Sequence, residues 1–180
     1  MDFFKNYFTL LSEKLSAIEE AQLEEAVTMI KSTMANERKL IIVGNGGSAA
    51  MSSHVAVDFT KNAGIRAINF NEADLLTCFA NDYGYEHWVS QALKFYAEKG
   101  DLAILISSSG SSKNILNGAA TARELGLRIM TFSGFKPENP LRQLGDINFY
   151  VDSRGYNIVE MTHHVWLVAL VDKVIGKIEY

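Results

Sequence analysis

From residue 37 onward, short uninterrupted apolar runs alternate with longer segments that carry an apolar residue at every third or fourth position. Uninterrupted runs are typical of strands buried on both faces, and the wider spacing is typical of amphipathic helices. The pattern predicts strands at residues 40–43, 66–70, 102–106, 128–132 and 147–151. It predicts helices at residues 48–62, 72–80, 86–97, 113–125 and 157–175, with a short one near Leu141. Strands that alternate with helices in this way indicate a doubly wound, five-stranded parallel α/β sheet.

The first 36 residues do not follow this alternation. Their apolar residues keep helical spacing throughout, without glycine or proline, so two amphipathic helices are predicted before the sheet begins. The chain is therefore interpreted as one domain, 1–180, with a helical arm at 1–36 and an α/β core at 37–180. The arm opens with the aromatic residues Phe3, Phe4, Tyr7 and Phe8. Either this arm covers its own domain, or it packs against a second subunit of a dimer or larger assembly.

Composition narrows the class of protein. Hydrophobic residues make up 48% of the chain and charged residues 21%, as in ordinary globular domains, and the net charge of −4 gives no basic footprint for nucleic acid. No apolar run approaches the ~20 residues that a membrane-spanning helix needs. Cys78 is the single cysteine, so no intrachain disulfide can form, which is typical of a reducing compartment. We therefore expect a cytoplasmic protein. From its charge and its apolar runs, we expect neither a nucleic-acid nor a membrane partner. The apolar neighbours Leu76 and Phe79 indicate that Cys78 is a core residue and not a nucleophile.

Two polar loops each join a predicted strand to the helix that follows it. The glycine loop, residues 44–48 (Gly-Asn-Gly-Gly-Ser), has the residues that a tight turn and a close approach of backbone to ligand require. The serine loop, residues 107–112 (Ser-Ser-Ser-Gly-Ser-Ser), offers a run of hydroxyl groups. Both loops precede helix N-termini, which favour anions. If the first and third strands are neighbours, the two loops predict a phosphorylated small molecule held between them, beyond the carboxyl ends of the strands.

Candidate chemistry lies on two predicted helices. His54 and Asp58 are four residues apart and share one helix face. This pair can bind a metal, the carboxylate can orient the ring, or the two can form an ordinary surface contact. The last helix carries Glu160, His163 and His164 among apolar residues. Adjacent histidines on a helix point in different directions, so at most one of them faces inward.

A further candidate is the pair Asn81 and Asp82. Both precede Gly84 in a predicted turn between two helical segments. Asn and Asp are common in turns for backbone reasons alone, and their side chains can also bind sugar hydroxyls.

These motifs together resemble the sugar isomerase (SIS) domain, and within it the phosphoheptose isomerases, which interconvert sedoheptulose 7-phosphate and a heptose 7-phosphate. The resemblance runs from about residue 1 to residue 175, with the motifs in family order and at family-like spacing. It implies a flavodoxin-like fold, an N-terminal helical arm and a homotetramer. The substrate-binding residues that it implies are Asn45, Gly46, Gly47, Ser48, Asn81, Asp82, Ser107, Ser108, Ser109 and Ser112. It also implies a zinc ion (Zn2+) bound by His54 and Asp58, with Asp58 as the base, and it calls for no nucleotide cofactor.

The last helix departs from this family. The family has a Gln followed by a Glu, and a His eight residues after the Gln; the Gln and the His bind zinc. The matching positions here are Val159, Glu160 and Leu167, and neither apolar residue can bind a metal or move a proton. His163 or His164 is then the candidate for the missing catalytic group. The chain is therefore expected to be a phosphosugar isomerase or, alternatively, a non-catalytic SIS module that binds a sugar phosphate or a protein partner.

Overall fold

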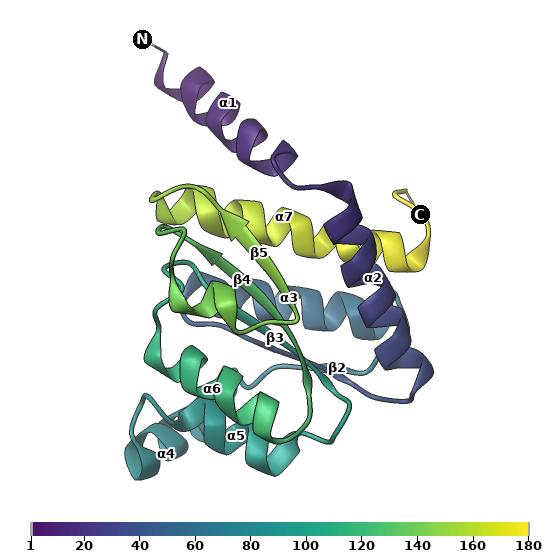
Figure 1. Cartoon of the computed structure of the whole chain (residues 1–180), viewed down its shortest axis with the longest axis vertical. Coiled ribbons are helices and arrows are strands. Elements are labelled where there is room, and N and C mark those ends of the chain that lie inside the picture. The colour runs from purple at the N-terminus through teal and green to yellow at the C-terminus, as the bar shows by residue number, and fades with distance from the viewer. Residues whose placement is uncertain (1, 180) are drawn as a thin grey trace.

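The computed structural model describes residues 2–179 and contains a single five-stranded sheet (Figure 1). Its strands are β1 (Leu40–Val43), β2 (Ala67–Ile68), β3 (Leu102–Ser107), β4 (Arg128–Gly134) and β5 (Ile147–Val151). Their order is β2-β1-β3-β4-β5, and each neighbouring pair is parallel. The predicted doubly wound α/β fold is therefore confirmed. In addition, β1 and β3 are neighbours, as the hypothesis of a ligand between the two loops requires.

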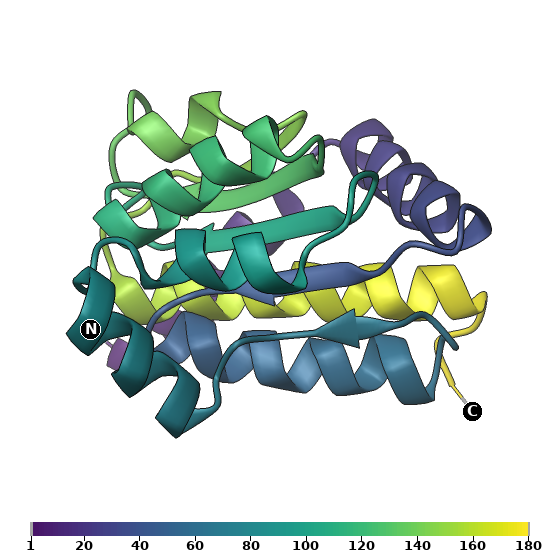
Figure 2. The ribbon, with the colours of Figure 1, turned by 90° about the horizontal axis from the view of Figure 1, so that it is seen from below.

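Helices cover both faces of the sheet. The helices of the described chain are α1 (Phe3–Ser16), α2 (Glu20–Ala35), α3 (Gly47–Lys61), α4 (Ala73–Tyr83), α5 (Trp88–Tyr96), α6 (Lys113–Glu124), the 3-10 helix η1 (Pro140–Gln143) and α7 (Tyr156–Ile175). On one face lie α2, α3 and α7, and on the other lie α5 and α6 (Figures 1 and 2). Successive residues of β1 alternate between the two cores: Leu40 and Ile42 belong to the first, Ile41 and Val43 to the second. Burial on both faces explains why the strands read as continuous apolar runs.

Three sequence-based expectations need correction. Strand β2 has two residues, not the predicted 66–70, because it is an edge strand that pairs only with β1. Asn81 and Asp82 lie in the last turn of α4, and the chain turns after them, at Gly84 with a φ of +86°. Cys78 is exposed, which contradicts its assignment to the core. Helix α4 packs mainly on α5 at the margin of the second core, and none of its residues is fully buried.

The N-terminal arm has one covered and one uncovered part. Helix α2 packs on α7 and β5, and α1 also contacts α7, but the start of α1 extends beyond the sheet (Figure 1). The indole N–H of Trp166 donates to the carbonyl oxygen of Leu15 at 3.0 Å and so ties the end of α1 to α7. Helix α1 has no buried residue, and Phe3, Phe4 and Phe8 are 63–70% exposed. Its aromatic face is therefore uncovered within one chain.

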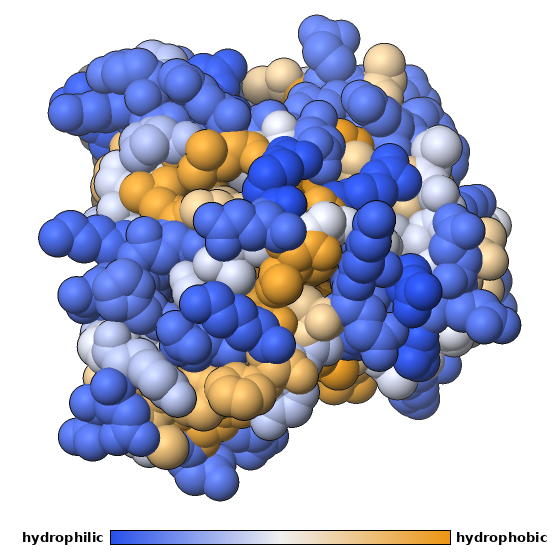
Figure 3. All heavy atoms as spheres, turned by 60° about the horizontal axis from the view of Figure 1, so that its bottom comes forward, coloured by the Kyte–Doolittle hydropathy of each residue, from blue (hydrophilic) through white to orange (hydrophobic). Residues whose placement is uncertain are grey.

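The face that carries α4, α5 and α6 is shown in Figure 3, where apolar side chains form separate patches among polar ones. Large apolar side chains exposed on α4, on α5 and between them are Tyr83, Tyr85, Phe95 and Tyr96. Within residues 2–179, no helix has both the length and the apolar character needed to cross a bilayer.

Candidate functional site

The glycine loop and the serine loop meet at the carboxyl edge of the sheet. Val43, the last residue of β1, pairs with Leu105 of β3, so the two loops leave the sheet side by side. Between them is a small pocket of about 100 Å³. Its lining comes from both loops and from the start of α7: Asn45, Ser48, Ile106, Ser107, Ser108, Ser109, Ser112, Tyr156 and Glu160. In this strand order, β1 and β3 form the switch point where ligands bind.

The glycine loop needs its glycines for two different reasons. Gly46, the residue before α3, has a φ of +53°, which favours glycine. At Gly44, an added Cβ atom would lie 2.5 Å from the Cβ of Ser48, so a side chain would collide with α3. No side chain caps the N-terminus of α3. The free N–H groups and the partial positive charge at that end of the helix therefore favour an anionic group beside it.

The serine loop is fixed by contacts within the loop and to the rest of the fold. Ser107 Oγ lies 3.0 Å from Ser112 Oγ, to which it donates a hydrogen bond. Gly110 has a φ of +65° and lies so close to the buried side chain of Asn139 that a larger residue would collide with it. Helix α6 begins directly after Ser112, whose side chain makes no capping hydrogen bond. The loop thus presents hydroxyl groups at the N-terminus of a second helix, an arrangement that suits an oxyanion.

Glu160, a candidate on the last helix to which the sequence analysis gave no role, is an acidic residue of the pocket. Its Oε1 accepts from Ser108 Oγ at 3.4 Å, and its carboxylate lies so close to Gly47 that any side chain at residue 47 would collide with it. At the N-terminus of α3, the helix dipole favours this negative charge. The sequence carries a signal for it, since Glu160 stands one helical turn before His164 in a mostly apolar helix.

His54, Asp58 and His164 form a hydrogen-bonded chain between α3 and α7. His54 Nδ1 lies 2.8 Å from His164 Nε2, and His54 Nε2 lies 3.1 Å from Asp58 Oδ2. Because a carboxylate only accepts, the proton is on His54 Nε2, and His54 Nδ1 accepts from His164. Burial and, next, the neighbouring His54 ring lower the pKa of His164, which keeps that ring neutral near pH 7. The structure therefore brings together three of the residues selected from the sequence.

Apart from Gly46, Gly47 and the His54 group, three selected residues lie outside the lining of the pocket. His163 is fully buried, and its Nε2 donates to the carbonyl oxygen of Ser133 at 3.0 Å. Burial lowers the pKa of His163 to about 4, against a smaller opposing effect of that hydrogen bond, so the ring is neutral in the core. Asn81 and Asp82 are exposed on α4, where Asn81 Nδ2 donates to Asp82 Oδ1 at 2.9 Å. His163 is therefore in the core, and Asn81 and Asp82 are on the surface of α4, so none of the three lines the pocket.

The donor atoms of the His54 group do not fit a zinc centre as they stand. Asp58 and His164 contact opposite nitrogens of the His54 ring, so the three do not face a common point. Val159 and Leu167, where the family resemblance calls for zinc ligands, are fully buried apolar side chains. Catalytic zinc sites commonly have three protein ligands, and residues 2–179 contain no group of three His, Cys, Asp or Glu side chains that could hold a metal ion. The metal role of His54 and Asp58 stays a prediction from the resemblance.

Asn114 and Tyr85 reach the site through Asn45. The side-chain amides of Asn45 and Asn114 bond to each other in both directions, at 3.0 Å and 2.8 Å. The hydroxyl of Tyr85 donates to Asn45 Oδ1 at 3.1 Å. Neither residue was assigned a role from the sequence, because their link to Asn45 depends on contacts between segments that are distant in the chain.

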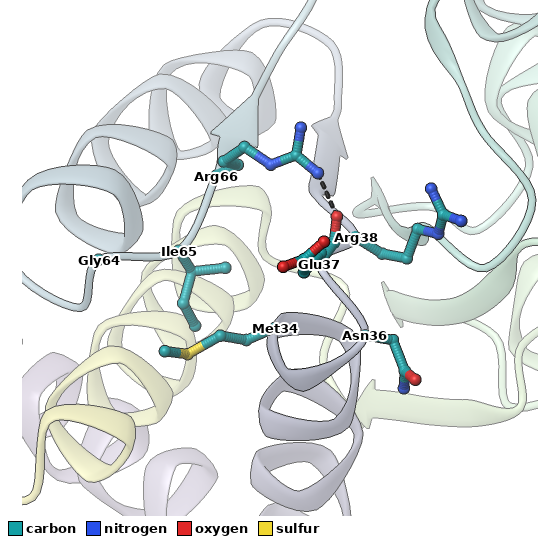
Figure 4. Close-up of a pocket in the computed structure, with 7 residues that line it drawn as sticks. All are labelled: Met34, Asn36, Glu37, Arg38, Gly64, Ile65 and Arg66. Carbon is teal, nitrogen blue, oxygen red and sulfur yellow. Dashed lines mark hydrogen bonds between the residues drawn. The ribbon is translucent and has the colours of Figure 1, made fainter.

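A larger pocket lies at the opposite edge of the sheet (Figure 4). It has a volume of about 510 Å³ and is lined by Met34, Asn36, Glu37, Arg38, Gly64, Ile65 and Arg66. Its two arginines already have partners: Arg66 donates to the carbonyl oxygen of Glu37, and Arg38 pairs with Glu98 at 2.8 Å. None of the residues selected from the sequence lines this pocket, so its greater volume does not make it the candidate site.

Known proteins resemble this chain along most of its length. A family model described as SIS domain matches residues 3–134. The phosphoheptose isomerase of Helicobacter pylori (strain P12) is 31% identical over 168 residues, which are 90% of this chain and 86% of the relative. The phosphoheptose isomerase of Aliarcobacter butzleri (strain RM4018) is 34% identical over 147 residues, which are 78% of this chain and 77% of the relative. Among solved structures, a phosphoheptose isomerase from Francisella tularensis has the same fold, with a TM-score of 0.88 at 21% identity, over 97% of this chain and 95% of that one.

Proposed function

The chain belongs to the SIS domain family, and on that premise we propose that it is an aldose–ketose isomerase acting on a phosphorylated sugar. Its relatives named phosphoheptose isomerases support sedoheptulose 7-phosphate as the ketose and a heptose 7-phosphate as the aldose. The observation that carries the proposal is the pocket between the two loops, with the Asp58–His54–His164 chain on the helices beside it. The arm at 1–36 and the core at 37–180 act as one domain in this proposal.

The two loops bind the phosphate group. Hydroxyls of Ser107, Ser109 and Ser112 and the N–H groups at the starts of α3 and α6 surround it, and hydrogen bonds to a charged oxygen are stronger than neutral ones. We also assign to ligand binding the lining residues Asn45, Ser48 and Ser108, together with Gly46 and Gly47 of the glycine loop. The glycines leave the backbone of the loop accessible to the ligand.

The distance along α3 from its first residue to His54 matches the length of a seven-carbon sugar. His54 lies seven residues after Gly47, which is about 10 Å along the helix axis at 1.5 Å per residue. A phosphate at the start of α3 therefore leaves the opposite end of an extended sugar chain beside His54 and His164. A seven-carbon ketose whose phosphate and carbonyl group are at opposite ends spans such a distance, whereas a triose phosphate does not.

Isomerisation needs a base beside the reacting carbons. A proton leaves C1 of the ketose while O2 gains one, which gives an enediol; C2 then gains a proton and O1 loses one, which gives the aldose. We assign the transfer at carbon to His164, because its Nε2–H is donated to His54 and its Nδ1 carries the lone pair. Asp58 fixes the tautomer of His54 and lies near the positive charge that develops on the two rings.

A homotetramer, or at least a dimer, is part of the proposal. The support is the aromatic face of α1, where Phe3, Phe4 and Phe8 would remain in water in a single chain. Light scattering at micromolar concentration tests this, and a mass near the 20.0 kDa of one chain contradicts it. A reducing, cytoplasmic location is likewise proposed, and the free Cys78 supports it.

Incubation of the purified chain with sedoheptulose 7-phosphate, followed by separation of ketose and aldose phosphates, tests the activity. We expect turnover by the parent and a kcat lower by about 10²–10⁴ for His164→Ala. His87→Ala is the matched control, because His87 is exposed and outside the pocket, and it should turn over like the parent. Zinc content measured on the same preparation tests the metal expectation separately. A parent protein without turnover, with or without added zinc, contradicts the proposed activity.

The second candidate function is a non-catalytic SIS module that binds a sugar phosphate without converting it. The burial of Val159 and Leu167 favours it, because the positions that bind metal in the family have no polar group here. Calorimetric binding of sedoheptulose 7-phosphate by a protein that shows no turnover would identify this function.

A further inference from the structure

Three segments that are distant in the sequence meet at the side-chain amide of Asn45. Asn45 follows β1, Asn114 lies in the first turn of α6 after β3, and Tyr85 lies between α4 and α5. Asn114 is only 2% exposed, and the partner of its amide is the amide of Asn45. A buried amide that loses its partner is destabilising, so this pair holds the two loops in a fixed relation.

These hydrogen bonds determine what Asn45 can offer to a ligand. Its Oδ1 accepts from Asn114 Nδ2 and from the Tyr85 hydroxyl, which uses both lone pairs of the oxygen. One N–H of its Nδ2 donates to Asn114 Oδ1, and the other has no acceptor in the described part of the chain. Asn45 lines the pocket. The group that remains for a ligand is therefore a donor, which suits an oxygen of a phosphate or a sugar.

We propose that Asn114 and Tyr85 are positioning residues that fix the Asn45 amide so that one N–H is presented to the bound sugar phosphate. The inference rests on the proposed function for the identity of the ligand. In the opposite orientation, the amide would turn its oxygen toward an anionic ligand, and the like-signed charges would repel. The Tyr85 bond also ties the segment between α4 and α5 to the pocket, although the Tyr85 ring is 51% exposed.

Tyr85→Phe tests the proposal with the loss of a single hydroxyl. We expect its Kd for sedoheptulose 7-phosphate, measured by calorimetry, to rise about fivefold, the effect of one neutral hydrogen bond. The thermal midpoint should stay near that of the parent. Tyr83→Phe is the matched control, because Tyr83 is exposed on the neighbouring turn and its hydroxyl makes no hydrogen bond within residues 2–179. The control should bind like the parent.

Asn114→Asp tests the amide pair at constant size. The new carboxylate can accept from Asn45 Nδ2 but cannot donate to Asn45 Oδ1, so the Asn45 amide loses its fixed orientation. We expect Kd to rise more than tenfold, from the lost orientation together with the charge added near the phosphate, whereas Asn6→Asp, on the exposed surface of α1, adds the same charge far from the pocket and should leave Kd unchanged. The decisive measurement is a double-mutant cycle: in an Asn45→Ala background, Tyr85→Phe should have no further effect on Kd. The double-mutant cycle uses only Tyr85→Phe and Asn45→Ala, so it can be measured even if Asn114→Asp does not fold.

Several results would overturn the inference. Equal Kd values for Tyr85→Phe and Tyr83→Phe would do so. The same fold-change in Kd on Tyr85→Phe in the parent and in the Asn45→Ala variant would also do so. A parent that binds the sugar phosphate without converting it contradicts only the proposed activity, because the cycle can still be measured by binding. A parent that binds no sugar phosphate contradicts both.

Discussion

Burial of His163 predicts a core that is sensitive to acid. The ring packs against Phe132 and Trp166, with ring centroids 5.6 Å and 6.2 Å away. Its Nε2 donates to the carbonyl oxygen of Ser133, and its Nδ1 has no partner among the described residues. Protonation of Nδ1 would place a charge in the apolar core, which is why burial lowers the pKa of His163 from 6.5 to about 4.

The size of the effect follows from the two pKa values of His163. Because the folded value is the lower one, the unfolded chain takes up the proton first, and the free energy of unfolding falls as the pH drops. Above pH 6.5 the ring is neutral in both states and no stability is lost. Between pH 6.5 and about 4 the loss approaches about 1.4 kcal/mol per pH unit, which gives about 2 kcal/mol at pH 5 and about 3 kcal/mol in total.

Urea titrations at pH 7 and pH 5, at one protein concentration, measure this loss. His163→Leu should lose about 1 kcal/mol at pH 7 with its hydrogen bond to Ser133. Between pH 7 and pH 5, however, it should lose about 2 kcal/mol less than the parent. His87→Leu, which replaces an exposed histidine, should keep the pH dependence of the parent. Equal losses for the parent and His163→Leu would refute the reasoning, because the core would then accept the proton without cost.

Three further substitutions separate ligand binding from stability. Gly47→Ala should keep or raise the thermal midpoint, because alanine favours a helix, but should weaken sugar-phosphate binding at least about tenfold, because its methyl group displaces the Glu160 carboxylate. Calorimetry that gives the affinity of the parent contradicts this. Asp101→Asn should lower the free energy of unfolding by about 3 kcal/mol in urea, because the fully buried Asp101 pairs with Lys39 Nζ at 2.7 Å. A loss below about 0.5 kcal/mol would show that the charge of this pair adds little. Ser109→Asp should raise the Kd at least about tenfold, or about 1.4 kcal/mol, by placing like charge beside the phosphate. An unchanged Kd would locate the ligand elsewhere.

The sheet could be predicted from the sequence because strands that are buried on both faces consist of continuous apolar runs. The bounds of β1 and β5 are those predicted from their apolar runs. The length of β2 could not be predicted, because an edge strand continues only as far as its one neighbour supports it. The exposure of Cys78 was missed for a related reason: helical spacing shows that α4 has an apolar side, but not which residues of α4 its packing on α5 leaves exposed.

The site could be predicted only in part. The glycine and serine loops were visible because strand order and backbone requirements place them together. The pairing of Asn45 with Asn114, 69 residues away, and with Tyr85, 40 residues away, has no counterpart in local spacing. The choice between His163 and His164 was also open, because adjacent residues on a helix differ by about 100° in direction. Only the packing of the helix shows which of the two meets His54.

That packing also bears on the departure of α7 from its family. Residues four apart share one side of a helix, and one such side of α7 is fully buried in the fold: Val159, His163 and Leu167. The neighbouring side carries Glu160, which lies against Gly47, and His164, which meets His54. Polar side chains at residues 159 and 167 would therefore be buried in the core. For this reason the proposed proton transfer is assigned to the side of α7 that carries Glu160 and His164.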